Sequence, residues 1–205
     1  MKTKMNKHDL LIKMYLGNDA LRYALTQVNL NNGILEATDG HILIRMPEKY
    51  AAGIYKPVEK YPNVLKVMYD KHEGGEYLVK TDALATLLAE AEGKYIINSE
   101  KCDDCEGIGV IECRCCGQDA DCDTCDGDGT IETSYPFAKL EYSGSNVIIE
   151  RRTFNPRYLH IIYITALILG KDDIIFKFTD DSLTKGATMC FDDITVLLMP
   201  IMPSN

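Results

Sequence analysis

The chain has 205 residues, of which 46% are apolar and 26% are charged, and its formal net charge is −9. A chain of this length can bury a core, and its composition is that of a globular protein of one domain or slightly more. No apolar run is long enough to span a membrane, and the basic, amphipathic first residues lack the apolar stretch of a secretory signal. We therefore exclude a membrane protein and expect a soluble, cytoplasmic one.

Three helices are predicted, each followed by strand-like runs. They cover residues 4–16 with Gly17 as a stop, residues 82–92 with Thr81 as N-cap, and residues 156–169 with Asn155 as N-cap and Pro156 in the first turn. Strand patterns occupy residues 21–28, 33–38, 41–46, 94–99, 130–135, 138–142, 147–152, 174–179, 186–191 and 194–200, and residues 51–75 form a surface connection. Helices followed by antiparallel strands predict an α+β fold with repeated helix–strand units.

The segment between the second and third predicted strands, residues 37–43, reads ATDGHIL. Taken alone, its Asp39 and Gly40 are typical of a hairpin turn. The hairpin signal Asn31-Asn32-Gly33 precedes it. Local chemistry therefore predicts two antiparallel strands here.

The middle of the chain carries seven of its eight cysteines. Cys102 and Cys105 open one copy of the pattern CxxCxGxG, and Cys122 and Cys125 open a second. Two such pairs form a closed tetrahedral zinc site, and the glycines permit the sharp turns that follow each pair. The repeats resemble the cysteine-rich region of DnaJ-type chaperones, a resemblance that implies a zinc-binding geometry and no chaperone activity. Four thiolates leave no open position for water, so we expect no catalytic zinc.

Three further thiols, Cys113, Cys115 and Cys116, lie between the two repeats. They could hold a second zinc with one borrowed ligand, for which His72 is a candidate. The alternative is a single zinc, with these thiols as spare ligands. Cys190 is expected to be a buried core thiol.

The cysteine segment is strongly acidic. Residues 100–128 contain ten acids and two bases, a formal charge of −8 out of the total of −9. An acidic segment repels phosphate, which disfavours a nucleic-acid-reading finger. Because strand-like runs flank it, we predict a body in two parts, residues 1–99 and 130–205, with residues 100–129 as a zinc-binding insertion at the tip of a hairpin.

Three segments together resemble the bacterial DNA polymerase sliding clamp (beta subunit). They are ATDGHIL at residues 37–43, TFNPRYL at residues 153–159 and LLMPIMP at residues 197–203. The resemblance implies that the first and last segments lie side by side and form a hydrophobic pocket for short peptides of partner proteins. The implied pocket residues are Thr38, Gly40, His41, Leu43, Leu197, Met199, Pro200 and Ile201.

The sequence also departs from this family. Where the family has an arginine after the histidine, this chain has Ile42. A clamp chain has three domains and this one has room for little more than one, so either a ring would require several copies, that is, a homo-oligomer, or there is no ring at all. The predicted helices carry few aligned cations, which gives a DNA contact little support.

We therefore predict a non-enzymatic, sliding-clamp-like accessory factor of DNA replication or processivity, of phage or mobile-element character. It would bind partner peptides through the implied pocket and hold one zinc, or two. The alternative is a zinc-stabilised protein-interaction or chaperone-like module in which the body is only a scaffold. The paired aspartates, such as Asp172 and Asp173, are turn residues rather than catalytic carboxylates.

Overall fold

A computed structural model describes residues 6–68, 73–91, 93–96, 99–112, 118–132, 139–142 and 146–202. The chain forms two compact units. The larger comprises Met1–Glu92 and Gly144–Asn205, and the smaller comprises Gly93–Ser143. None of the helices in the described ranges is both long and apolar enough to cross a membrane.

The larger unit contains three α-helices, three 3₁₀ helices and nine strands within the described residues. In chain order they are α1 (Lys7–Lys13), η1 (Ala20–Thr26), β1 (Asn29–Asn31), β2 (Ile34–Thr38), β3 (Ile42–Pro47), η2 (Glu48–Tyr50), η3 (Val64–Lys66), β4 (Glu76–Lys80), α2 (Thr81–Glu90), β11 (Val147–Ile149), β12 (Arg152–Phe154), α3 (Pro156–Leu169), β13 (Asp173–Phe178), β14 (Ala187–Phe191) and β15 (Ile194–Leu198).

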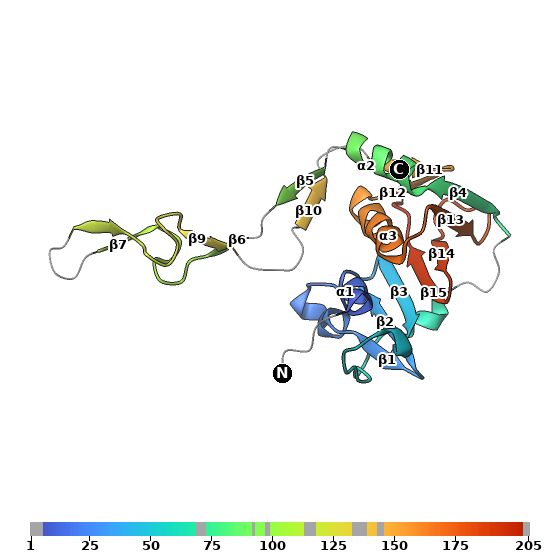
Figure 1. Ribbon diagram of the computed structural model, residues 1–205, viewed down its shortest axis with the longest axis horizontal. Coiled ribbons are helices and arrows are strands. Elements are labelled where there is room, and N and C mark those ends of the chain that lie inside the picture. The colour runs from blue at the N-terminus through green and yellow to red at the C-terminus, as the bar shows by residue number, and fades with distance from the viewer. Residues whose placement is uncertain are drawn as a thin grey trace. The chain divides into compact units, whose positions relative to one another are not determined.

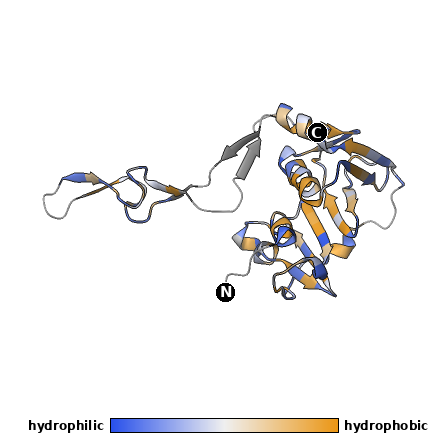
Figure 2. Cartoon of the chain, viewed as in Figure 1, coloured by the Kyte–Doolittle hydropathy of each residue, from blue (hydrophilic) through white to orange (hydrophobic). Residues whose placement is uncertain are grey.

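Seven of these strands form one antiparallel sheet in the order β1-β2-β3-β15-β14-β13-β4 (Figure 1). The central pairing, β3 with β15, joins strands from the two ends of the chain. Apolar residues gather on the central strands and on α3 (Figure 2). Helix α3 packs on α1 and α2, and the Tyr15 hydroxyl after α1 lies 2.7 Å from the Thr165 hydroxyl of α3. The α+β class predicted from the sequence is confirmed.

The predicted helices are present with altered ends. Helix α3 has the predicted bounds: the Asn155 side chain accepts a hydrogen bond from the Arg157 N–H, and Gly170 ends the helix with φ 66°. Helix α1 begins after a capping box of Asn6 and Asp9 and ends before Gly17. In α2 the predicted N-cap Thr81 is instead the first helical residue, and its hydroxyl donates to the Lys171 carbonyl.

Three local predictions are wrong. Residues 21–28 do not form a strand, because the Asp19 side chain caps the Leu21 N–H and starts the 3₁₀ helix η1. The strand predicted at 147–152 is a hairpin of β11 and β12, since Glu150 turns the chain with φ 56°. Cys190 is exposed rather than buried, because it lies on the outer face of β14.

The smaller unit consists of short antiparallel ladders. Strand β5 (Gly93–Ile96) pairs with β10 (Lys139–Tyr142), β6 (Ser99–Lys101) pairs with β9 (Thr130–Glu132), and β7 (Val110–Glu112) pairs with β8 (Asp119–Asp121). The cysteine repeats lie in the turns between the second and third ladders. This arrangement brings the two repeats face to face.

Candidate metal centre and peptide-binding cluster

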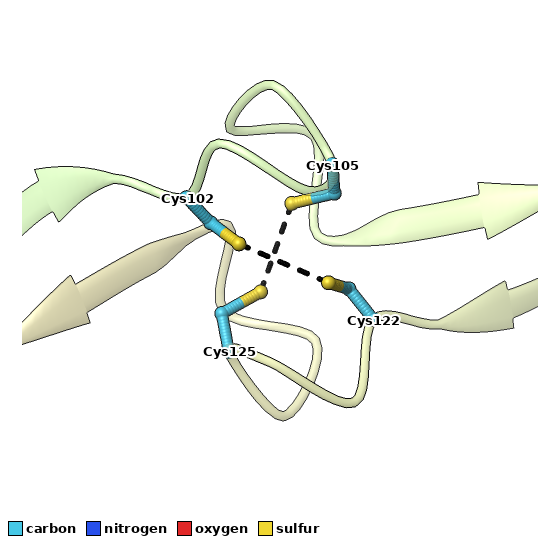
Figure 3. Close-up of side chains that lie close together, drawn as sticks. All are labelled: Cys102, Cys105, Cys122 and Cys125. Atoms are coloured by element: carbon cyan, nitrogen blue, oxygen red, sulfur yellow. Dashed lines mark hydrogen bonds between the residues drawn. The ribbon is translucent and has the colours of Figure 1, made fainter.

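Four buried cysteine side chains converge in the smaller unit. The sulfur atoms of Cys102, Cys105, Cys122 and Cys125 all lie within 4.8 Å of one another (Figure 3). The distance is 3.8 Å between Cys102 Sγ and Cys122 Sγ and 3.7 Å between Cys105 Sγ and Cys125 Sγ. A tetrahedral Zn²⁺ with Zn–S bonds of about 2.3 Å separates its sulfur ligands by about 3.8 Å. The observed spacing is therefore consistent with one metal ion.

The two repeats hold these thiols with the same backbone geometry. The Cys102 N–H donates to the Gly129 carbonyl at 2.9 Å, and the Cys122 N–H donates to the Gly109 carbonyl at 2.8 Å. The Gly109 N–H lies 3.2 Å from Cys105 Sγ, and the Gly129 N–H lies 3.2 Å from Cys125 Sγ. Each repeat therefore fixes its partner and directs a backbone dipole at one sulfur.

The glycines after each cysteine pair are required for this close approach. A Cβ on Gly109 would lie 2.2 Å from the Gly127 carbonyl oxygen, and a Cβ on Gly129 would lie 2.5 Å from the Gly107 carbonyl oxygen. Both residues also have positive φ angles, of +82° and +71°. No other residue type satisfies both conditions without strain.

The four thiols can ionise together only if a positive charge lies close to them. Burial raises the pKa of the Cys105 thiol, but the Gly109 N–H and the neighbouring thiols outweigh burial and bring its pKa to about 7. Burial and the three neighbouring thiols raise the pKa of Cys125 to about 12, although the Gly129 N–H acts to lower it. Thiols this close cannot all ionise without a compensating positive charge, and a bound metal supplies that charge.

The cysteine cluster also takes the place of a hydrophobic core in the smaller unit. Among the described apolar side chains of the smaller unit, these four cysteines are the buried ones, and they form a cluster of their own. Ile108 is 72% exposed, and Val110, Ile111 and Ile131 are also exposed. The other candidate ligands, Cys113, Cys115, Cys116 and His72, lie outside the described residues.

A second site arises where the two clamp-like motifs meet. Leu43 of β3 lies directly opposite Leu197 of β15, and the Met199 N–H donates to the His41 carbonyl at 2.9 Å. The turn between β2 and β3 is fixed locally. The Thr38 hydroxyl donates to the Ile42 carbonyl, and the Asp39 carboxylate accepts from the His41 N–H at 2.8 Å. Residues more than 150 positions apart in the sequence are thereby held side by side.

These residues form part of a hydrophobic cluster, which we call the Leu43 cluster. Buried Leu43, Val64 and Leu197 form its centre, and partly buried Tyr61, Met68 and Met199 pack against it. Tyr61, Val64 and Met68 come from residues 51–75, which the sequence patterns indicated only as a surface connection, without site residues. Their spacing of three and then four residues is the signal that could have identified them.

The remaining predicted pocket residues lie around this cluster. Gly40 and His41 are exposed, and the His41 ring stacks on Tyr158 of α3 with 5.6 Å between ring centroids. Pro200 is buried, and the Ile201 N–H donates to the Thr153 carbonyl at 2.8 Å, which directs this end of the chain towards β12.

Two neighbouring side chains, Ile42 and Arg45, do not contribute to the Leu43 cluster. Ile42 is 1% exposed. It faces away from Leu43, since successive strand residues point to opposite faces of a sheet. The Arg45 Nε is 3.1 Å from the Glu36 carboxylate and forms an ion pair with it. Arg45 therefore does not replace the family's arginine at the position of Ile42.

Comparison with known proteins identifies the fold. No family model matches the chain, and no curated protein matches it. Among solved structures, the DNA polymerase sliding clamp from Bacillus subtilis matches with a TM-score of 0.53 and 13% identity, over 97% of this chain and 62% of that chain. The DNA polymerase III beta chain from Streptococcus pneumoniae gives 0.52 and 11%, over 99% and 66%. The beta sliding clamp from Caulobacter crescentus gives 0.50 and 16%, over 98% and 66%.

These matches show that the chain has a sliding-clamp-like fold. They place the resemblance over nearly the whole chain, beyond the three short segments that indicated it in the sequence. The chain spans less than two-thirds of the length of these clamps.

Proposed function

We propose that the protein is a non-enzymatic, sliding-clamp-like accessory factor of DNA replication or processivity, which binds short peptides of partner proteins through the Leu43 cluster. The observation that supports this most is the pairing of Leu43 with Leu197, with Val64 and Met199 packed beside them. Leu43, Val64 and Leu197 are buried, so the apolar wall open to a peptide consists of the partly buried Tyr61, Met68 and Met199 packed against them. The flexible methionine side chains make this wall adaptable. Such a wall suits an extended peptide with one or two apolar anchor residues.

Binding of a synthetic peptide that carries a clamp-binding motif tests this proposal. We expect saturable binding in calorimetry, and we expect the double variant His41→Ala with Met199→Ala to abolish it. Met202→Ala is the matched control, because Met202 is 63% exposed and lies beyond the cluster. Wild-type protein that binds no such peptide, or a double variant that binds as wild type does, would refute the proposal.

Encirclement of DNA is not part of this proposal. A chain shorter than two-thirds of a clamp would need further copies to close a ring. The acidic residues 100–128 carry a formal charge of −8, which disfavours contact with phosphate in that segment. A cytoplasmic location is compatible with the unpaired CxxC cysteines, because free thiols persist in reducing compartments. A phage or mobile-element origin stays a prediction from the sequence.

We infer that the ion at the metal centre is Zn²⁺ and that its role is structural. Four thiolates in a closed tetrahedral set are the ligands that structural zinc prefers. Elemental analysis of purified protein should return one zinc per chain for this site, or two if Cys113, Cys115 and Cys116 hold another. Protein that is folded throughout the smaller unit but contains no metal would refute this assignment.

The second candidate function is a zinc-stabilised interaction or chaperone-like module. It is favoured by Ile108, which is 72% exposed between Gly107 and Gly109 in the first repeat. In the second repeat Asp128 occupies the same place, so the metal centre does not require an apolar residue there. If this function holds, Ile108→Asp should abolish suppression of aggregation of an unfolded client protein, while peptide binding at the Leu43 cluster is absent.

A further inference from the structure

Strand β4 ends the seven-stranded sheet and has no partner on its outer edge among the described residues (Figure 1). Its side chains are exposed at four of five positions, with Tyr77 44% and Leu78 52% exposed. The opposite end of the sheet differs. There β1 is three residues long, and its Leu30 N–H donates to the Lys56 carbonyl at 3.2 Å. The free edge of β4 is therefore the open end of this sheet, and an open edge is a template for another strand.

The hydrogen bonds to β13 determine which backbone groups of β4 are free. The Thr81 N–H donates to the Asp172 carbonyl at 2.9 Å, and the Phe178 N–H donates to the Gly75 carbonyl at 3.0 Å. Bonded and non-bonded pairs alternate along an antiparallel ladder. Odd-numbered residues of β4 therefore bond β13, and the N–H and C=O groups of Glu76, Leu78 and Lys80 point to the free edge.

The sequence of β4, EYLVK, is complementary to itself when reversed. In an antiparallel pair centred on Leu78, each Leu78 lies opposite the other, and Glu76 lies opposite Lys80 of the second copy. This register also places the three residues with free backbone groups opposite one another. A shift by one residue would pair free groups with groups already bonded to β13, so the backbone and the side chains favour the same register.

The neighbouring strand extends this complementarity. Lys177 of β13 pairs with Glu76 at 2.9 Å, and Asp173 pairs with Lys80 at 2.6 Å. Across the seam, each charged row would then run positive, negative, positive, negative. Between these rows Leu78 lies opposite Ile175, which is 37% exposed, so the central row would be apolar throughout. Opposite charges and apolar pairs directly across strands both stabilise a sheet.

We propose that β4 is a homodimer seam: two copies of the chain join their sheets by antiparallel pairing of β4 with β4 about a twofold axis at Leu78. The interface is isologous, because the same five residues serve on both sides. This inference is independent of the Leu43 cluster and of the metal centre. It provides one route by which a chain shorter than a clamp forms a larger assembly.

Sedimentation velocity of the full chain in its metal-bound form, over a wide range of concentration and at physiological ionic strength, tests this seam. We expect a monomer–dimer equilibrium. Leu78→Lys should abolish the dimer by placing two like charges on the axis. The matched control is Ile148→Lys on β11, since Ile148 is 64% exposed and lies outside the seam.

Charge reversal distinguishes this register from other interfaces. Glu76→Lys places lysines opposite Lys80 of the second copy, and Lys80→Glu places glutamates opposite Glu76, so each variant alone should be monomeric. An equimolar mixture of the two variants should recover the dimer, because each strand then meets its opposite. A wild type that stays monomeric, a Leu78→Lys variant that still dimerises, or a mixture that remains monomeric would overturn the proposal.

Amide exchange measured by NMR gives a second readout within the wild type. On dimerisation, the amides of Glu76, Leu78 and Lys80 should become protected, while Tyr77 and Val79, already bonded to β13, should change little. Equal protection at all five positions, or at none of them, would contradict this register.

Discussion

At the scale of single residues, Gly107 and Gly109 allow two constraints on the cysteine turns to be tested separately: the positive φ angle and the close contact with the opposite backbone. Both have φ near +80°, so an alanine at either position costs about 1–2 kcal/mol. At Gly109 the new Cβ also meets the Gly127 carbonyl oxygen, whereas at Gly107 it meets the Lys101 side chain, which can rotate away.

We therefore predict that Gly109→Ala loses metal to a competing chelator much more readily than Gly107→Ala does. A colorimetric zinc-chelator titration of the two variants measures the difference. Equal metal retention in both would contradict the assigned role of the backbone contact.

Asp9 is a buried carboxyl group whose ionisation should affect the stability of the larger unit. Burial raises its pKa, but hydrogen bonds from the Tyr55 hydroxyl and from the N–H groups of Gly53, Ala52 and Asn6 outweigh burial and lower the pKa below its usual value. A carboxyl group with a lowered pKa in the folded state stabilises it above the pKa of the unfolded chain. That stability is lost as pH falls through the folded pKa.

We predict that Asp9→Asn lowers the free energy of unfolding by about 1–3 kcal/mol at neutral pH and flattens the acid limb of the stability profile. Thermal unfolding followed from neutral pH to below pH 4 measures both effects. Tyr55→Phe, which removes one donor and leaves the carboxylate, should show a smaller loss with the acid limb retained. Asp9→Asn that unfolds with the wild-type pH dependence would contradict the role of this carboxylate.

At the scale of elements, the features that depend on neighbouring residues, such as helix ends and cysteine turns, could be predicted from short sequence patterns. Helix α3 has the predicted bounds because Asn155, Pro156 and Gly170 mark both of its ends in the sequence. The grouping of Cys102, Cys105, Cys122 and Cys125 was predicted from their spacing, and the four side chains converge as expected. Residues 21–28 were mistaken for a strand because the capping interaction of Asp19 is compatible with the same apolar pattern.

Elements that depend on distant contacts were harder to predict. The role of Val64 is visible only once β3 and β15 pair, because Leu43 and Leu197 are the residues on which it packs. Strand β4 has only three apolar residues in a row, a run too short to distinguish a strand from part of the helix that follows, and its pairing with β13 defines it. Sequence patterns thus identified both motifs of the Leu43 cluster, but not the connection that completes it.

The ladders of the smaller unit should depend on the metal. Each is three or four residues long, and the buried apolar side chains described between them are the four cysteines. Isolated two-stranded ladders of this length are at best marginally stable in water. We predict that chelation, or Cys102→Ser with Cys105→Ser, unfolds the smaller unit while the larger unit keeps its unfolding temperature.

Backbone NMR spectra recorded with and without chelator test this prediction, and Cys190→Ser is the control, because Cys190 is exposed and lies in the larger unit. Spectra of the smaller unit that survive complete removal of metal would contradict it.

At the scale of the whole molecule, the two units have separate proposed tasks. The larger unit has the sliding-clamp-like fold and holds the Leu43 cluster and the β4 edge. The smaller unit holds the metal centre and most of the negative charge, since residues 100–128 carry −8 of the net −9. Peptide binding, dimerisation and metal binding should therefore respond to different variants.

Binding of a partner peptide at the Leu43 cluster can be observed through the methyl spectrum of the methionines. With 8 methionines in the chain, ¹³C-methyl labelling gives a small set of signals. On titration with a clamp-binding-motif peptide, the Met199 and Met68 methyl signals should shift, while those of buried Met189 and exposed Met202 remain in place. If the Met199 and Met68 methyl signals do not shift at saturating peptide, the Leu43 cluster is not the peptide-binding site.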